Sequence, residues 1–388
     1  MLVDELLLPW LERIRAELPG LSLFDAHTHI GEDDPDGFRC SPGELKEALE
    51  LAGARALVFP LHEPAGYPAA NDRVIAAAAA SDGRLVPFCR VDPHADPLAE
   101  AERALGAGAR GIKLHPRAER FTLEHPALPG LFALAHERRL PILCHAGRGI
   151  PALGRDALEL CARFPDARLI LAHAGICDLA WIWREAPDHP NLFFDTAWSS
   201  PADLLALFAL VPPGQILFGS DTPYGTPTFS ATMTLRYALQ AGLTADAARQ
   251  VAGRQLERIV AGDEPLDVGP PPGTERLSRD ALLDRVSAFL MMALGRMFRS
   301  GEPEEPLALA ALACEVGDDA PQAPICRSIL ALLEERQEYV AAGVSERRPT
   351  FAPGIHLVIA AAGLSRTPDV PLPPDPVRVD VGERAAPH

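Results

Sequence analysis

The sequence predicts an α/β protein, a (β/α)8 TIM barrel followed by a C-terminal helical extension. Eight short apolar runs recur between residues 21 and 225, and helix-like segments separate them. Each run ends at Gly, Pro or polar residues, as strands buried on both faces of a parallel sheet do. An open doubly wound sheet also alternates strand and helix, but eight units favour closure into a barrel.

The eight predicted strands follow one another at regular spacing. They lie within residues 21–30, 54–62, 85–93, 108–116, 140–147, 167–175, 191–198 and 215–225. Among the helices between them, the one that begins after Ser41 carries Glu44 three residues later, which is a capping-box pattern. The 388 residues, 48% of them hydrophobic, suffice for one barrel and an appendage.

The sequence outside the barrel divides into four segments. Apolar residues at helical spacing predict an amphipathic N-terminal helix in residues 1–20. The barrel takes residues 21–262, and a Pro/Gly-rich linker follows in 263–276. Amphipathic helices fill residues 277–365, and the Pro-rich, charged residues 366–388 predict a disordered tail.

Composition excludes several classes of protein. The formal net charge is −17, and no basic face suggests a nucleic-acid partner. No apolar run is long enough to cross a membrane, and the N-terminus does not resemble a signal peptide. The seven Cys are scattered without a CxxC pair, which favours a reducing, cytoplasmic setting without disulfides.

Histidines gather at the predicted carboxyl ends of the barrel strands, where barrel enzymes carry their active sites. Asp221 lies in the eighth run. Five of the 12 His take such strand-end positions: His27, His29, His115, His145 and His173. Side chains alternate along a strand, so Leu171 and His173 are expected to share the inner face of their strand. The same alternation directs Cys144 outward and His145 inward.

Two of these histidines, His27 and His29, are spaced to bind one metal ion from the same face of a strand. Neutral imidazole suits zinc and similar ions, and Asp221 from the opposite wall would complete a nitrogen and oxygen site. A bound metal lowers the pKa of its water from 15.7 to about 7. The pattern therefore predicts a divalent metal, with zinc favoured, that activates water.

The segments FDAHTHIG, CHAG, LAHAG and GSDTPYG resemble the strand signatures of the amidohydrolase superfamily. The resemblance covers about residues 21–262 and is nearest to the branch that includes aminocarboxymuconate-semialdehyde decarboxylase. It implies catalytic roles for Lys113, His173 and Asp221. It also implies a larger ligand set for one or two metal ions: His27, His29, Lys113, His145, His173 and Asp221.

Lys113 is unusual because only two of the 36 basic Lys and Arg residues are Lys, at positions 46 and 113. A buried Lys can lose its proton, whereas Arg cannot. The resemblance implies that a neutral Lys113 becomes a carbamate that bridges two metals. The alternative is a protonated amine that pairs with Asp221 or with a substrate carboxylate. With one metal, His173 would instead act as an acid or base.

Four further residues are candidates for contact with a small-molecule substrate. Arg90 and Arg148 fall near strand ends, and Arg binds carboxylates well. Tyr224 is a candidate wall of the pocket, and His115 either touches substrate or closes the barrel mouth. The apolar helix faces of the extension must be buried, by docking on the barrel, by covering its mouth or by assembly into a homo-oligomer.

The leading functional hypothesis is a hydrolase in which metal-activated water attacks an amide, lactone or ester carbonyl. The alternative is a metal-dependent nonoxidative decarboxylase of an unsaturated or aromatic acid, since the scaffold alone does not fix the reaction. A barrel nuclease of the TatD type is disfavoured, because that family offers a Glu where this chain has Lys113. A non-catalytic metal-binding barrel is disfavoured by the complete ligand set.

Overall fold

In the computed structural model, residues 2–277, 279–343 and 352–372 are described. An eight-stranded parallel barrel forms the centre of this part of the chain. The third predicted strand is interrupted at Phe88 and appears as two elements, β3 and β4. The strands are β1 (Leu23–Ile30), β2 (Ala54–Pro60), β3 (Leu85–Pro87), β4 (Cys89–Arg90), β5 (Ile112–Leu114), β6 (Pro141–Cys144), β7 (Arg168–Leu171), β8 (Leu192–Asp195) and β9 (Ile216–Leu217).

Backbone hydrogen bonds link these strands in chain order and close the ring. Strands β1 to β3 form one parallel sheet and β4 to β9 another. Phe88 N donates to Val58 O over 2.9 Å and joins the two sheets on one side. On the other side Ala26 N donates to Phe218 O over 2.8 Å and His29 N to Thr222 O over 2.7 Å. The expected TIM barrel is thus confirmed, and its carboxyl strand ends meet at one mouth.

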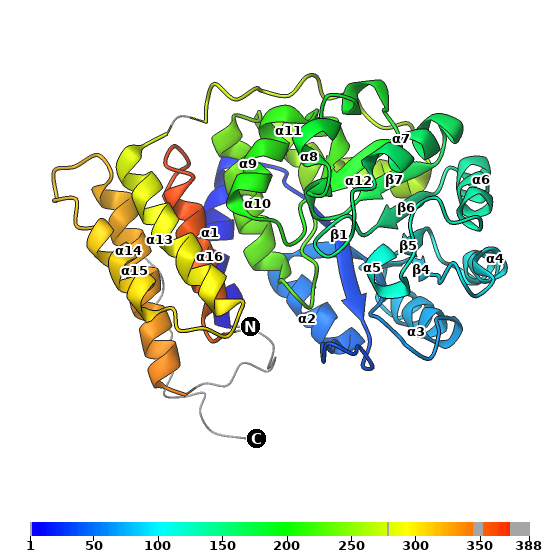
Figure 1. The fold of residues 1–388 in the computed structure, drawn as a ribbon, viewed down its shortest axis with the longest axis horizontal. Coiled ribbons are helices and arrows are strands. Elements are labelled where there is room, and N and C mark those ends of the chain that lie inside the picture. Colours follow the sequence, from blue (N-terminus) through cyan, green and yellow to red (C-terminus); the bar gives the residue numbers. More distant parts are fainter. Residues whose placement is uncertain (1, 278, 344–351, 373–388) are drawn as a thin grey trace.

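Helices surround the barrel as the alternating pattern predicted (Figure 1). Ser41 caps α2 with a capping box, because its side chain accepts from Glu44 N and the Glu44 carboxylate accepts from Ser41 N. The helices are α2 (Pro42–Ala52), α3 (Pro68–Ala79), α4 (Pro97–Ala107), α5 (Pro116–Glu119), α6 (Leu128–Arg138), α7 (Gly154–Arg163), α8 (Leu179–Ile182), α9 (Pro201–Leu210), α10 (Pro227–Ala241), α11 (Ala245–Arg249) and α12 (Gln255–Ala261).

Two apolar layers fill the barrel wall. The interior is packed with aromatic and branched side chains, including Phe24, Leu57, Phe59, Leu143 and Phe193. The outer layer, between strands and helices, contains Cys144 and Leu171 among many others. Cys144 therefore faces outward while Leu143 faces inward, as alternation along this strand predicted. All seven Cys are free thiols.

The chain on either side of the barrel packs against one barrel helix, α10. The N-terminal helix α1 (Leu2–Glu17) contacts α10, and its Trp10 and Leu11 are fully buried. Residues 263–276 contain neither helix nor strand. The extension consists of α13 (Ala281–Met297), α14 (Glu304–Ala313), α15 (Ala323–Ala341) and α16 (Ile355–Ser365). Helix α16 packs on α13 and α15 and also touches α10, so the extension lies against one side of the barrel (Figure 1).

The expected disordered tail differs from the structure in its first residues. Thr367 is fully buried, and it accepts hydrogen bonds from the Arg236 guanidinium of α10, which also donates to Pro371 O over 2.9 Å. Asp369 N donates to the Gln240 side chain over 3.0 Å. Residues 366–372 are thus ordered because they supply acceptors for a buried cation, and residues 373–388 lie outside the described part. No helix in the described residues is long and apolar enough to cross a membrane.

Candidate metal centre at the barrel mouth

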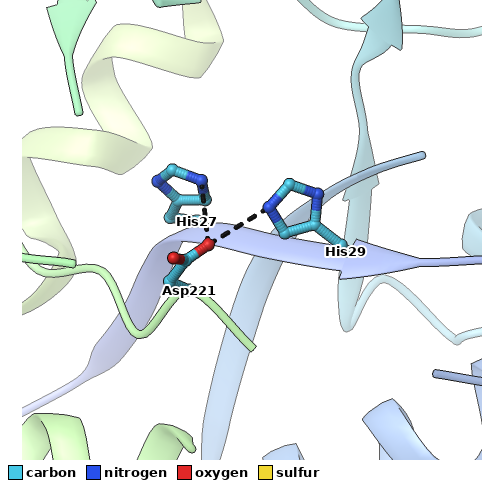
Figure 2. Close-up of side chains that lie close together, drawn as sticks. All are labelled: His27, His29 and Asp221. Atoms are coloured by element: carbon cyan, nitrogen blue, oxygen red, sulfur yellow. Dashed lines mark hydrogen bonds and ion pairs between the residues drawn. The ribbon is translucent and has the colours of Figure 1, made fainter. Parts of the chain in front are cut away.

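Three buried side chains offer ligand atoms around one point at the mouth. His27 and His29 come from β1, and Asp221 comes from the segment that follows β9. Their ligand atoms all lie within 4.8 Å of one another. His27 Nε2 is 3.3 Å and His29 Nε2 is 3.2 Å from Asp221 Oδ1 (Figure 2). The expected pair of histidines and the distant carboxylate therefore meet.

The other ring nitrogen of each histidine is held by an oxygen. His27 Nδ1 lies 2.7 Å from Asp195 Oδ2, and His29 Nδ1 lies 3.3 Å from the Pro60 carbonyl oxygen. A carbonyl oxygen only accepts, so Nδ1 of His29 carries the proton and Nε2 keeps its lone pair. Metal-binding histidines in proteins are oriented by this kind of outer hydrogen bond.

Burial keeps both imidazoles of the group neutral. It lowers the pKa of His27 and His29 well below its ordinary value, so both rings are neutral at pH 7. Burial also raises the pKa of Asp221, and the Lys113 ammonium opposes this shift. Two neutral imidazoles and one buried carboxylate form a donor set for zinc or a similar divalent ion. The residues present thus fit the metal that the sequence predicted.

Lys113 projects from β5 into the same space. Its Nζ lies 3.2 Å from His27 Nε2 and 4.6 Å from the centre of the Phe59 ring. Burial, aided by the charge of Arg90, lowers the pKa of Lys113 to about 8. The amine therefore loses its proton far more easily than an exposed Lys. Carbamylation of Lys113 stays a prediction.

Three histidines form a second group beside the first. His173 Nδ1 donates to Ala197 O over 3.0 Å, so its Nε2 keeps a lone pair, and this atom lies 3.0 Å from His145 Nδ1. His115 stacks on His145 with ring centres 4.0 Å apart, and its Nδ1 accepts from Ala118 N. Metal ligation by His145 and His173 stays a prediction, as does substrate contact by His115.

Left-handed backbone conformations turn several of these residues into the mouth. His173 has φ 58° and Asp221 has φ 59°, values that are uncommon outside Gly. Alternation placed Leu171 and His173 on one inner face, and this prediction was wrong. Ile170 and Ala172 pack inside the barrel while Leu171 packs outside. His173 reaches the mouth because the chain turns there, and such strain is often concentrated at functional sites.

Asp195 at the end of β8 is a central residue that the sequence reasoning missed. It is fully buried and accepts from His27 Nδ1, from His173 N over 2.8 Å and from Ala197 N over 3.0 Å. One carboxylate therefore orients a ligand histidine and the turn that carries His173. Its position at the end of an apolar run, as in the other site strands, was the available signal.

The three other predicted substrate residues have different surroundings. Arg90 is buried, its Nε and Nη2 donate to Glu119, and its Nη1 donates to Pro60 O. These contacts do not support a substrate role for Arg90, because all three nitrogens are engaged within the protein. The Tyr224 ring lies 5.9 Å from that of His29 and lines the site. Arg148 is exposed at the mouth.

Comparison with known proteins agrees with this geometry. A family model described as amidohydrolase matches residues 24–254, more than half of the chain. The chain belongs to the amidohydrolase family. None of the curated proteins searched matches its sequence.

Three solved structures have the same barrel fold. A TIM-barrel protein from Bordetella bronchiseptica is 18% identical with a TM-score of 0.50, and the match covers 62% of this chain and 99% of that one. An amidohydrolase II is 19% identical with a TM-score of 0.50, covering 62% and 100%. A 2,6-dihydroxybenzoate decarboxylase from Rhizobium is 14% identical with a TM-score of 0.50, covering 62% and 99%. The protein is therefore an enzyme of this family, and helices α13 to α16 lie beyond the residues that the family model matches.

Proposed function

We propose that this amidohydrolase-family enzyme is a metal-dependent hydrolase that uses activated water to cleave an amide, lactone or ester of a small molecule. The observation that carries the proposal is the convergence of three buried donors, His27 Nε2, His29 Nε2 and Asp221 Oδ1, within 4.8 Å. Both rings are neutral and have a lone pair at Nε2, and among the described residues three protein side chains form this group. A site with few protein ligands leaves positions for water and substrate.

A divalent cation such as zinc, held by these residues, would polarise the substrate carbonyl and acidify a water molecule. The protein groups supply the rest. Asp221 would accept the proton of the attacking water at its second carboxylate oxygen and pass it to the leaving group. His173, fixed by Ala197 O, would orient the water or the substrate through the His145 contact. Lys113 would stabilise negative charge that develops on the substrate oxygen.

A second reaction, nonoxidative decarboxylation, is favoured by one specific observation. Lys113 places a buried amine beside the metal ligands, 3.2 Å from His27 Nε2. In its protonated form this amine would bind a substrate carboxylate, which a decarboxylase requires and an ester hydrolase does not. Asp221 or His173 would then deliver a proton to the substrate carbon.

Elemental analysis of the purified full chain and an activity screen test the proposal together. We expect bound zinc or a similar metal, and hydrolysis of members of a lactone, ester and amide panel. Asp221→Asn should lose most of the metal and at least about 100-fold of the activity, because one charged ligand is gone. The control is Asp33→Asn, at an exposed position of the loop after β1, which should change neither. Carbon dioxide release from aromatic acids without any hydrolysis would select the decarboxylase, and a metal-free active enzyme would contradict both.

A further inference from the structure

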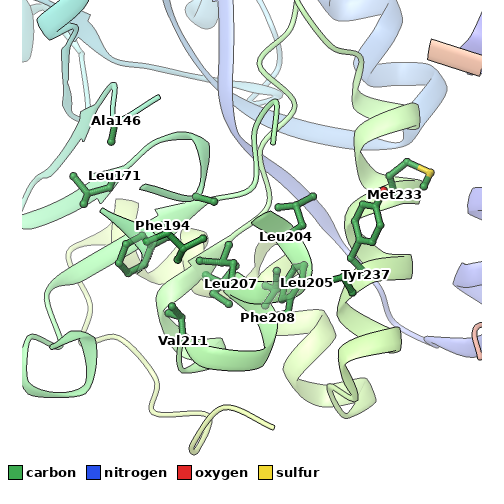
Figure 3. Packing of buried hydrophobic residues seen from close by; sticks show 14 of the residues in the cluster. Ala146, Leu171, Phe194, Leu204, Leu205, Leu207, Phe208, Val211, Met233 and Tyr237 are labelled. Carbon is green, nitrogen blue, oxygen red and sulfur yellow. The ribbon is translucent and has the colours of Figure 1, made fainter. Parts of the chain in front are cut away.

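A cavity of about 80 Å³ lies where the helical extension meets the barrel mouth. The segment after β8 and helices α9 and α10 form its barrel side, and α13 and α16 form the other side. Figure 3 shows Leu204 on α9 and Met233 and Tyr237 on α10, which line it from the barrel. On the extension side the lining side chains are Met291 and Leu294 of α13, Phe298 directly after α13, and Ile359 of α16. Four of the 16 lining residues thus come from a part of the chain that the family model does not match.

The cavity shares one short backbone segment with the metal centre. Ala197 O accepts from His173 Nδ1, and Ala197 N donates to Asp195, the residue that orients His27. The two neighbours of Ala197, Thr196 and Trp198, line the cavity. A molecule in the cavity therefore touches the same turn that positions His173.

A single cationic side chain, Arg148, stands among the described residues that line this cavity, and none of them is acidic. Arg148 follows His145 by three residues and lies over the Phe298 ring at 5.9 Å. Within the described ranges its guanidinium makes no hydrogen bond or ion pair. An apolar cavity with one unpaired guanidinium at the mouth is complementary to a carboxylate that carries an apolar body.

We propose that this cavity binds the apolar aryl or alkyl body of an organic carboxylate substrate, with its carboxylate on Arg148. That the bound carboxylate is a substrate rests on the proposed function, whereas its binding in the cavity does not. Met291, Leu294 and Phe298 then determine specificity, because they set the width of the cavity from the side of the extension. The extension thereby selects which carboxylates reach a catalytic centre that the barrel builds.

Calorimetric titration of the full-length protein with 4-phenylbutanoate tests the proposal directly. Met291→Trp should fill the cavity and weaken binding by about tenfold or more. Met292→Trp is the matched control, since Met292 is the next residue of α13, is 49% exposed and does not line the cavity. It should bind within about twofold of the parent protein. Phe298→Ala, at a position that is 41% exposed, provides a second change to the wall that the fold should tolerate.

The charge is tested with a neutral ligand of the same shape. Arg148→Gln should weaken 4-phenylbutanoate binding by about tenfold and leave 4-phenylbutanamide binding unchanged. Equal binding by the Met291→Trp and Met292→Trp proteins, or no binding of the acid by the parent protein, would overturn the proposal. These experiments measure binding and not turnover. The binding results therefore keep their meaning if the proposed hydrolysis is not found, and detection of hydrolysis would not support the proposal if the binding test fails.

Discussion

At the scale of single residues, Asp195 links the metal ligands to the rest of the site. Its carboxylate is fully buried and accepts from one imidazole and two backbone N–H groups. Asp195 contributes to metal binding by orienting the His27 ring, because His27 must present Nε2 and not Nδ1 to the cation.

We expect Asp195→Asn to weaken metal binding by about 10- to 100-fold, because the amide both weakens the bond to His27 Nδ1 and disturbs the turn at His173. Competition with a chelator measures the affinity. Asp188→Asn, at an exposed position, serves as the control. Wild-type metal affinity in the Asp195→Asn protein would show that the contact does not orient His27.

The buried histidines also make stability depend on pH. Burial lowers the pKa of His173 to about 4 from its ordinary 6.5, and it lowers the pKa of His115 in the same direction. Between about pH 4 and 6.5 the unfolded chain therefore binds protons that the folded chain does not. The free energy of unfolding falls as pH decreases through this window, by up to about 1.4 kcal/mol per pH unit for each such histidine.

We expect His115→Asn to reduce the slope of the free energy of unfolding against pH, below about pH 6.5, by up to about 1.4 kcal/mol per pH unit. The reason is that the variant lacks one histidine that binds a proton in the unfolded chain. Asn at this position keeps an acceptor for Ala118 N. Urea unfolding at several pH values measures the slope. The exposed His94, changed to Asn, is the control. An unaltered slope would mean that His115 is protonated in the folded protein.

At the scale of elements, local sequence is enough to set helix ends but not the loops of the mouth. Ser41 and Glu44 form the capping box that their spacing predicted. By contrast, the left-handed residues His173, Trp198 and Asp221 each interrupt a run whose residue types are compatible with a continuing strand. Their conformation depends on partners from other strands, such as His27 O, which accepts from Asp221 N.

Ser41→Ala should lower stability by about 1 kcal/mol, because Glu44 N loses its acceptor. The expected fall in Tm is about 2–4 °C or less for a chain of this size. Thermal unfolding followed by circular dichroism detects it. Ser41→Thr keeps the hydroxyl and should remain near the parent value. An Ala variant as stable as the parent would show that the box contributes nothing.

At the scale of the whole molecule, the extension and the barrel share an interface centred on α10 and α16. Gly363 of α16 faces Met233 and Tyr237 of α10 so closely that a Cβ atom there would displace the end of the Met233 side chain and crowd the Tyr237 hydroxyl. Gly295 of α13, in contrast, faces open space. This close approach joins the part of the chain that the family model matches to the part that it does not.

Gly363→Leu should therefore cost about 2–3 kcal/mol through overpacking. Gly295→Leu should be neutral or gain up to about 1 kcal/mol from helix propensity. Denaturant unfolding compares the two proteins. If the barrel unfolds at the same midpoint in both while only the extension loosens, the two parts do not form one cooperative unit.

The sequence by itself determined the barrel, the capping box, the outward Cys144 and the residue types of the metal centre, because these follow from local periodicity and spacing. His27 and His29 were found from their spacing at a predicted strand end, although the register of β1 shifts between Asp25 and Thr28. Tertiary structure alone decided that Asp195 orients His27 and that Glu119 accepts the hydrogen bonds of the Arg90 guanidinium. It also decided that His173 turns inward and that residues 366–372 pack on α10. Each of these depends on a partner distant in the sequence, and a linear pattern carries no distance between such residues.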